Sequence, residues 1–367
     1  MATTETPEET GAPADLASQV RGADLVRVVS RADGDGLAAA AILGRACADQ
    51  DLPRHVSVSP SREAATARLE ESGAGIALGF DGPDGFCSGD SAALCAYETA
   101  VALGANPDPG LALAGAVAAG VPPKGPALEA AEEQGIERRA GLSVPTTDVT
   151  TGLAYTGLLH ADFSGDEEAT AAFLEDLDLA DPRDTQSHKT LASAVAMEVT
   201  DGPTGKQAIE SLQRALGPLE SPGPFETVGG YADVLGAAAS LDPGKGLVAL
   251  LGSIDEDRLL DLWQTYGATL HEAVADLSES DGEPLTTTVE DVSPLDVAGL
   301  GYTYAVDADR LYVSGSDSIA LAAGEDNARS VLASKFEEES VTGTDTLATV
   351  ATDADLEAIV EDIEAAS

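Results

Sequence analysis

Basic residues are scarce in this chain of 367 residues, because 19 Lys and Arg residues stand against 65 Asp and Glu residues and the formal net charge is −46. The acidic residues are spread along the chain, and 43% of its residues are hydrophobic, too many for a disordered acidic protein. Such a surface fits a cytoplasm of very high salt, where charges are screened within about 3 Å. The lack of a basic patch counts only a little against nucleic-acid binding there, since salt weakens phosphate contacts anyway.

Cysteines are few, and long apolar runs are lacking. The three cysteines, Cys47, Cys87 and Cys95, have no C-x-x-C spacing, so they indicate neither a zinc site nor a disulfide framework. We expect them to be small buried side chains. No apolar run reaches about 18 residues, and the N-terminus lacks a charged-then-apolar pattern. We therefore expect a cytoplasmic protein that does not contact a membrane.

A strand, a tight turn and a helix follow one another over residues 25–48. The run LVRVV predicts a buried strand, Ser30–Gly36 is rich in Asp and Gly, and the Ala-rich stretch after it has high helix propensity. Asp33 and Asp35 project from the turn, at the sheet edge where open α/β folds place their ligands. Two carboxylates there suit Mg²⁺ or Mn²⁺, although helix capping alone also favours Asp at such positions.

The letters SRADGDGLAAAAIL resemble the first motif of the DHH phosphoesterase family, which usually reads S-H-x-D-x-D-G-x-x-S-A-A. Arg31 takes the place of the usual His. The stretch FSGDEEATAAFLEDL, at 163–177, resembles the archaeal RecJ-like proteins of that family. These proteins include single-strand exonucleases and inactive relatives that serve the replicative helicase.

The resemblance implies further site residues. Asp81 follows the third predicted strand and aligns with the second acidic position of the family. Gly229, Gly230 and Gly236 align with a segment that faces the substrate phosphate in the DHHA1-type domain, where Tyr231 replaces the usual His. We expect Asp33, Asp35 and Asp81 to converge at one sheet edge as a vestigial metal site.

The Asp-His-His motif of active members is absent from this chain. Its four histidines are His55, His160, His188 and His271, and none lies between Asp81 and the helix that follows it. The strand-helix unit that usually fills this interval is also missing. Hydrolysis by this family requires two metal ions about 3.5–4 Å apart, so three carboxylates predict at most one weakly bound Mn²⁺ or Mg²⁺. We expect the isolated histidines to be structural or solvated, with His271 on a helix surface.

Alternating strands and helices predict an α/β fold, with a doubly wound parallel sheet and a second, smaller α/β domain. The expected parts are a disordered acidic tail (1–22), a DHH-like domain (23–150), a helical connector and linker (151–224) and a DHHA1-like domain (225–367). We expect a hinge near Pro218–Phe225, because the stretch Glu198–Phe225 contains four prolines and is typical of a linker. Strands are expected at 25–29, 55–58, 75–80, 302–306, 311–314, 319–323 and 347–351.

Three functions fit these features. The favoured one is a non-catalytic RecJ-like accessory subunit in replication or repair, which binds GINS or helicase-like proteins and possesses no catalytic residue. The second is a degenerate Mn²⁺-dependent exonuclease acting on single-stranded DNA. The third is a small-molecule phosphoesterase. Loss of the imidazole ligands together with a strand-helix unit favours the first, while retention of the three carboxylates favours the second.

Overall fold

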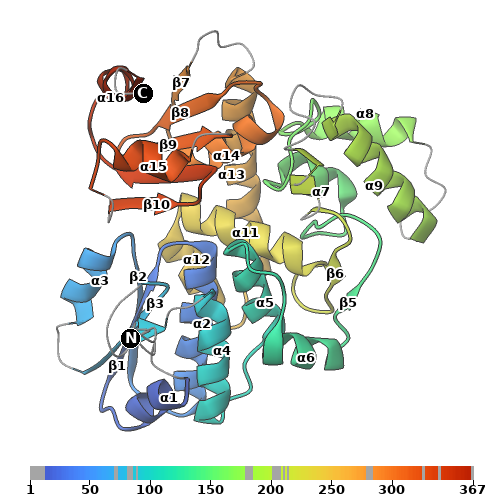
Figure 1. Ribbon diagram of the computed structural model, residues 1–367. Coiled ribbons are helices and arrows are strands. Elements are labelled where there is room, and N and C mark those ends of the chain that lie inside the picture. The colour runs from blue at the N-terminus through green and yellow to red at the C-terminus, as the bar shows by residue number, and fades with distance from the viewer. Residues whose placement is uncertain are drawn as a thin grey trace, which may run out of the picture. The chain divides into compact units, whose positions relative to one another are not determined.

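The computed structural model describes residues 13–69, 73–80, 86–87, 90–177, 185–200, 208–209, 211–212, 215–277, 284–324, 327–337 and 340–364. The chain forms two compact units (Figure 1). Unit 1 comprises Met1–Arg139, Val144–Thr147 and Leu219–Trp263, and unit 2 comprises Ala140–Ser143, Asp148–Pro218 and Gln264–Ser367. Among the described residues, no helix is both long enough and apolar enough to span a bilayer.

Unit 1 is built on a parallel sheet of four strands in the order β2-β1-β3-β4. The central strand β1 (Val26–Arg31) pairs with β2 (Arg54–Ser59) and β3 (Ala74–Leu78), and β3 pairs with the short β4 (Phe86–Cys87). Helix α2 (Gly34–Asp49) packs on β1 and β2, and α3 (Arg62–Leu69) packs on β1 and β3. The two helices lie on opposite sides of the sheet in Figure 1. This arrangement confirms the predicted parallel sheet with helices on both faces.

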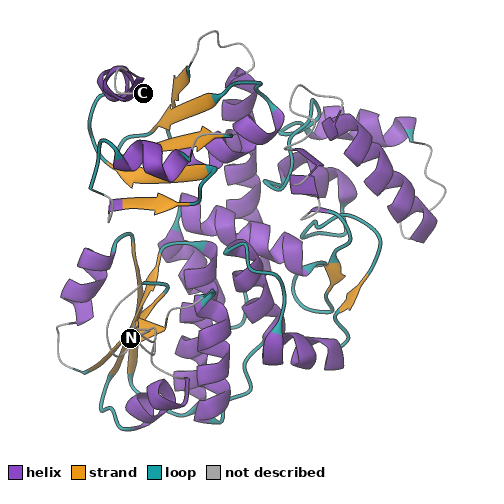
Figure 2. Cartoon of the chain, in the orientation of Figure 1, coloured by secondary structure: helices purple, strands orange, loops and turns teal. Residues whose placement is uncertain are grey.

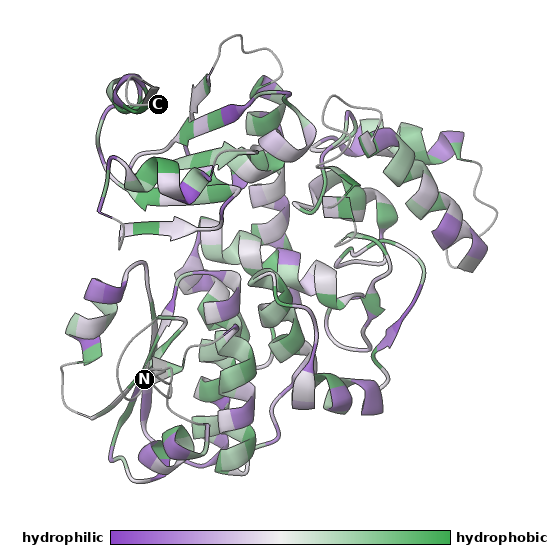
Figure 3. Cartoon of the chain, viewed as in Figure 1, coloured by the Kyte–Doolittle hydropathy of each residue, from purple (hydrophilic) through white to green (hydrophobic). Residues whose placement is uncertain are grey.

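Helix α2 is the core of unit 1. Most of its residues are buried, because four helices pack around it as well as the sheet. These are α4 (Ala92–Leu103), α5 (Pro109–Ala118), α11 (Val228–Leu241) and α12 (Pro243–Leu251). Figure 3 shows the apolar colour along much of α2, α4 and α5. A helix that is apolar on all sides must be covered on all sides, which explains why α2 has so many neighbours.

Unit 1 also contains α1 (Pro13–Arg21), α6 (Gly125–Glu133) and an antiparallel pair of short strands, β5 (Glu137–Arg138) and β6 (Leu219–Glu220). Leu16, Ala17 and Val20 of α1 are buried, since α1 packs on α4. The prediction of a disordered tail over residues 1–22 is therefore wrong for Pro13–Arg21, which form α1. Residues 1–12 lie outside the described residues.

Unit 2 contains a mixed sheet of five strands in the order β10-β11-β9-β8-β7 (Figure 2). Strands β7 (Leu285–Thr288) and β8 (Arg310–Ser314) are parallel. Strands β9 (Ser318–Ala323), β11 (Leu347–Ala351) and β10 (Val341–Gly343) continue the sheet in antiparallel fashion. A hydrophobic core joins this sheet to α15 (Ala328–Ala333) and α16 (Leu356–Glu364). Further helices are α7 (Val149–Tyr155), α8 (Glu167–Asp176), α9 (Thr185–Thr200) and α14 (Pro294–Tyr304), and α13 (Glu256–Leu277) runs through both units.

One predicted strand is wrong. Residues 302–306 were expected to be extended because of their Tyr, Thr and Val content, but Tyr302–Tyr304 end helix α14. The Ser293 side chain caps the first turn by accepting a hydrogen bond from Asp296 N, and Pro294 follows it at the first helical position. These two start signals override the local strand propensity.

The unit boundaries also differ from the expected domain boundaries. Helices α11 and α12 were assigned to the DHHA1-like domain, yet they pack on α2, α11 also packs on α5, and both belong to unit 1. Their Ala- and Gly-rich faces permit this close packing. One passage of the chain between the units, from Pro218 to Leu219, falls at the start of the segment predicted as a hinge.

The expectation about cysteine is wrong for two of the three. Cys87 of β4 and Cys95 of α4 form a disulfide with a Cα–Cα separation of 6.0 Å, while Cys47 is free and buried. A separation of eight residues does not reveal this pair in the sequence. It forms because α4 packs on β4, which brings the two cysteines within disulfide reach.

Candidate functional site

Asp33 caps the helix that follows strand β1. Its backbone is extended, and its Oδ1 accepts a hydrogen bond from Gly36 N at 2.7 Å. Its Oδ2 accepts a hydrogen bond from Arg31 Nε in an ion pair at the protein surface. Arg31, which stands where the DHH motif usually has His, therefore neutralises the carboxylate of Asp33. The Asp33 side chain is still 36% exposed, so it is accessible to solvent.

Asp35 lies in the first turn of α2 and is only 3% exposed. Its Oδ1 accepts hydrogen bonds from Ser91 Oγ at 2.8 Å and from Ala93 N at 2.9 Å. Its Oδ2 accepts one from Ala92 N at 2.7 Å. These three donors belong to the N-terminal end of α4, where backbone N–H groups have no partner within their own helix. Asp35 is thus a long-range cap for a second helix.

Burial raises the pKa of Asp35 to about 6, and the nearby Asp33 charge acts in the same direction. The hydrogen bonds from Ala93, Ser91 and Ala92 act in the opposite direction, because they stabilise the ionised form. The positive end of the α4 dipole also favours a carboxylate here. The balance leaves a carboxylate that is buried, hydrogen-bonded and partly protonated in mildly acidic solution.

Helix α5 closes over Asp35. A Cβ on Gly115 of α5 would lie 2.7 Å from the Ala38 Cβ and 3.3 Å from Asp35 Oδ1, so no larger residue fits between these helices. Helix α11 closes over Gly34 in the same way, since a Cβ on Gly34 would lie 3.1 Å from Gly236 N. The turn that carries the two Asp residues is therefore covered by helices of its own unit.

The other predicted site residues have different surroundings. Asp81 lies outside the described residues. Gly229, Gly230 and Gly236 all belong to α11, and a Cβ on Gly230 would collide with the backbone of Val144 and Pro145. Gly230 is thus required for helix packing in unit 1. A role for these glycines in phosphate binding stays a prediction.

The described residues do not fit a two-metal centre. None of their His, Cys, Asp and Glu side chains form a group of three or more that could hold a metal ion. The oxygens of Asp35 already accept three hydrogen bonds, and those of Asp33 face a backbone N–H and a guanidinium. A metal ion would have to share these oxygens with the donors. Because Asp81 lies outside the described residues, the predicted convergence of three carboxylates on a cation stays a prediction.

Sequence reasoning missed the partner of Asp35. Ser91 is not among the predicted site residues, yet its hydroxyl both donates to Asp35 and accepts from Leu94 N at 3.3 Å. A Ser before an Ala-rich helix is a recognisable N-cap signal. That signal predicts the local cap, but not the carboxylate 56 residues earlier that completes it.

Sequence reasoning also missed a pair of histidines in unit 2. His160 Nδ1 and His271 Nδ1 are 3.0 Å apart, and the rings stack with centroids 5.2 Å apart. His271 was expected on a helix surface but is 1% exposed, because Gly165 packs directly on it. Its Nε2–H donates to the Thr156 carbonyl at 3.1 Å, so its Nδ1 accepts the proton of His160 Nδ1–H. Burial lowers the pKa of His160 to about 4 and that of His271 to about 3.

Comparison with known proteins places the chain in a family and a fold. No family model matches the sequence. The uncharacterized protein rrnAC1427 of Haloarcula marismortui is 38% identical over 298 residues, which are 80% of this chain and 79% of that protein. An exonuclease RecJ bound to manganese superposes with a TM-score of 0.50 at 16% identity, over 99% of this chain and 94% of that one.

RecJ from Thermus thermophilus, in complex with Mn²⁺, gives a TM-score of 0.52 at 15% identity. It matches 99% of this chain, which spans 55% of the Thermus protein. At such identities the similarity to RecJ concerns the fold, whereas the Haloarcula protein is a relative in sequence. The chain therefore belongs to the family of the Haloarcula marismortui protein, and its fold is similar to that of RecJ.

Proposed function

We propose that this protein is a non-catalytic RecJ-like accessory subunit of a replication or repair assembly. The observation that supports it most is the position of Asp35, whose two oxygens cap helix α4. A carboxylate whose oxygens already accept three hydrogen bonds in the core has little capacity left for a metal ion. The motif that carries catalysis in the family has here become part of the packing of unit 1.

Charge supports the same proposal. Hydrolysis of a phosphodiester gathers negative charge in the transition state, and metal ions or cationic groups must offset it. Near the motif turn, the Arg31 guanidinium is already paired with Asp33. Binding to protein partners is a use of the fold that requires no such cations.

The partners that fit this proposal are GINS or helicase-like replication proteins in the cytoplasm, with single-stranded DNA as a further ligand of the assembly. A single weakly held Mn²⁺ or Mg²⁺ at Asp33 and Asp81 remains compatible with it. Such an ion would require the Arg31 side chain to turn away from Asp33, because both would compete for Oδ2.

A nuclease assay tests the proposal. The full chain is incubated with 5′-labelled single-stranded DNA and Mn²⁺ in molar KCl, with an active RecJ exonuclease as the positive control. We expect no release of nucleotides above the buffer background. Mn²⁺-dependent release that disappears in Asp33→Asn would contradict the proposal and support the exonuclease alternative.

A binding assay tests the other half of the proposal. Size-exclusion chromatography of the full chain with GINS from the same organism should show one complex, and Asp33→Asn should leave it unchanged. Absence of a complex, together with nuclease activity in the first assay, would contradict the proposal and show that the protein is an enzyme.

A further inference from the structure

The disulfide between Cys87 and Cys95 joins strand β4, at the edge of the parallel sheet, to helix α4 within unit 1. Strand β4 pairs with β3 through two residue pairs. The Gly79 N–H also donates to the Cys87 carbonyl at 3.2 Å. A strand this short has few ladder hydrogen bonds, so the covalent link to α4 contributes much to holding β4 on the sheet.

Helix α4 does not depend on this disulfide for its position. Ser91, Ala92 and Ala93 lie between the two cysteines in sequence. Their hydroxyl and N–H groups donate to the carboxylate of Asp35. The helix also packs on α1, α2 and α5. Cleavage of the S–S bond would therefore leave α4 in place and remove a constraint on β4 alone.

The two bonded cysteines differ in exposure. Cys87 is 1% exposed, whereas Cys95 is partly exposed on α4. An external thiolate therefore reaches the Cys95 Sγ first, and Cys87 becomes the leaving group. The two cysteines are eight positions apart in sequence. A disulfide that closes so short a loop restricts the unfolded chain less than one that closes a long loop, so its reduction costs less stability.

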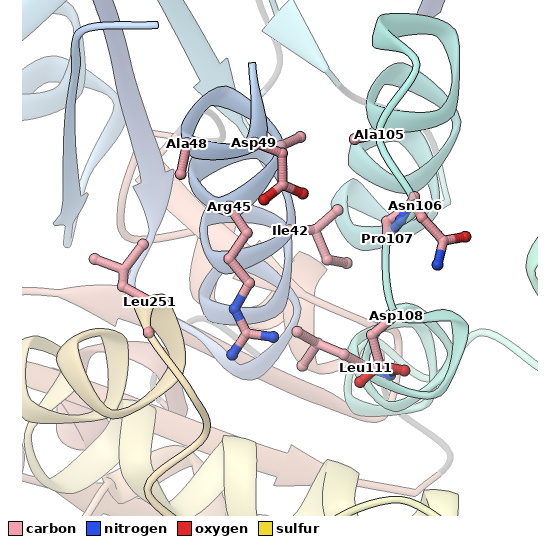
Figure 4. A pocket seen from close by; sticks show the side chains of 12 residues that line it. Ile42, Arg45, Ala48, Asp49, Ala105, Asn106, Pro107, Asp108, Leu111 and Leu251 are labelled. Atoms are coloured by element: carbon pink, nitrogen blue, oxygen red, sulfur yellow. Dashed lines mark hydrogen bonds between the residues drawn. The ribbon is translucent and has the colours of Figure 1, made fainter. Parts of the chain in front are cut away.

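The third cysteine, Cys47, takes no part in this exchange. Its neighbours Ala46 and Ala48 line a pocket at the C-terminal half of α2 (Figure 4), but Cys47 is not a lining residue and is 0% exposed. Burial raises the pKa of its thiol to about 11, so little thiolate forms at neutral pH. The structure therefore offers one pair of cysteines for redox chemistry and one inert thiol.

We propose that Cys87 and Cys95 are a reversible thiol–disulfide switch, which fixes β4 to α4 in the oxidised protein and releases β4 from β3 when a dithiol reduces it. The switch rests on the cytoplasmic location proposed above. Disulfides are rare in the cytoplasm, and those that form there are mostly transient and catalytic or redox-sensing.

Reduction transfers two electrons from the dithiol to the protein. One thiol of the reductant loses its proton and attacks the Cys95 Sγ, the S–S bond breaks, and Cys87 leaves as a thiolate that takes up a proton. The second thiol of the reductant then attacks the mixed disulfide at the reductant's own sulfur. The Cys95 thiolate leaves and is protonated, and the reductant ends as a cyclic disulfide.

Thiol counting tests whether the bond is reversible. The full chain in 2 M KCl is reduced with dithiothreitol or reoxidised with oxidised glutathione, and its free thiols are alkylated in denaturant before mass spectrometry. We expect one alkylated cysteine, Cys47, in the oxidised protein, three in the reduced protein, and a return to one after reoxidation. Three alkylated cysteines in every condition, or one after dithiothreitol, would overturn the switch.

Hydrogen exchange resolved to single amides tests what the switch moves. We expect the Gly79 amide to exchange at least tenfold faster in the reduced protein, while the Ala92 and Ala93 amides change less than twofold. Equal exchange of Gly79 in both states would overturn the proposal. Exchange that rises equally at Ala92 and Ala93 would also overturn it, because α4 would then not stay in place.

Variants separate the disulfide from other effects of the reductant. Cys87→Ser/Cys95→Ser should show the fast Gly79 exchange with and without dithiothreitol. Cys47→Ala is the matched control and should respond to dithiothreitol as the unchanged protein does, and a Cys47→Ala protein that does not respond would contradict the assignment to Cys87 and Cys95. These measurements use neither DNA nor a partner protein, so their failure is distinguishable from failure of the proposed accessory function.

Discussion

The Asp35 carboxylate joins two helices through residues that lie 56 positions apart in sequence. Asp35→Ala would leave the N–H groups of Ala92 and Ala93 buried without an acceptor, so we expect the free energy of unfolding to fall by about 2–4 kcal/mol. Urea denaturation in molar KCl measures this change. Asp90→Ala, which removes an exposed carboxylate beside the same helix, is the control and should change stability little. A loss no larger than that of the control would show that Asp35 does not hold α4.

The histidine pair of unit 2 makes stability depend on pH. The pKa values of His160 and His271 are lowered from the usual 6.5 to about 4 and about 3, so between pH 6.5 and 4 the unfolded chain binds more protons than the folded one. Stability from this pair is present above pH 6.5 and is lost as the pH falls toward 4, by an amount on the order of 3 kcal/mol for each histidine.

The double variant His160→Phe/His271→Phe provides the comparison, because it removes the two titrating imidazoles and keeps all carboxylates of the chain. We expect the unchanged protein to lose stability relative to this variant as the pH falls, in denaturation curves recorded between pH 7 and 4. If the free energies of unfolding of the two proteins changed with pH in the same way, His160 and His271 would not be buried and neutral in the folded protein.

At the scale of elements, α11 shows how glycine positions determine packing. Gly230→Ala would place a methyl group against the backbone of Val144 and Pro145, which cannot move aside as a side chain can, so we expect a loss of at least about 2 kcal/mol. Gly236→Ala on the same helix meets nothing within 4 Å and should instead gain up to about 1 kcal/mol. Opposite signs in thermal melts check the packing of α11, whereas equal effects would contradict it.

Elements are also the level at which the sequence was most informative. The run LVRVV and the Ala-rich stretch after it predicted β1 and α2, because β-branched residues and alanines act locally. Tyr302–Tyr304 were misassigned as a strand, because the helix α14 that Ser293 caps at its start continues through them. The contacts of Asp35 with Ser91 could not be predicted, since they depend on tertiary packing that brings distant turns together.

At the scale of the whole molecule, the net charge of −46 determines the conditions for folding. Self-repulsion of this size is tolerated when the screening length is about 3 Å at 1 M salt, but not when it is about 10 Å at 0.1 M. We expect the chain to unfold as KCl is lowered from 2 M to 0.1 M, with circular dichroism as the measurement. Full helix content at 0.1 M KCl would contradict the proposed adaptation to high salt.

The central claim is that the carboxylate of Asp35 serves the fold of unit 1 and not a metal ion. Anomalous diffraction at the manganese absorption edge, from crystals of the full chain soaked in Mn²⁺, tests it most directly. The account predicts no manganese peak beside Asp35, whose oxygens should still accept hydrogen bonds from Ser91, Ala92 and Ala93. A manganese peak about 2.0–2.6 Å from an oxygen of Asp35, with Asp33 as a second ligand, would contradict the account and restore the metal site.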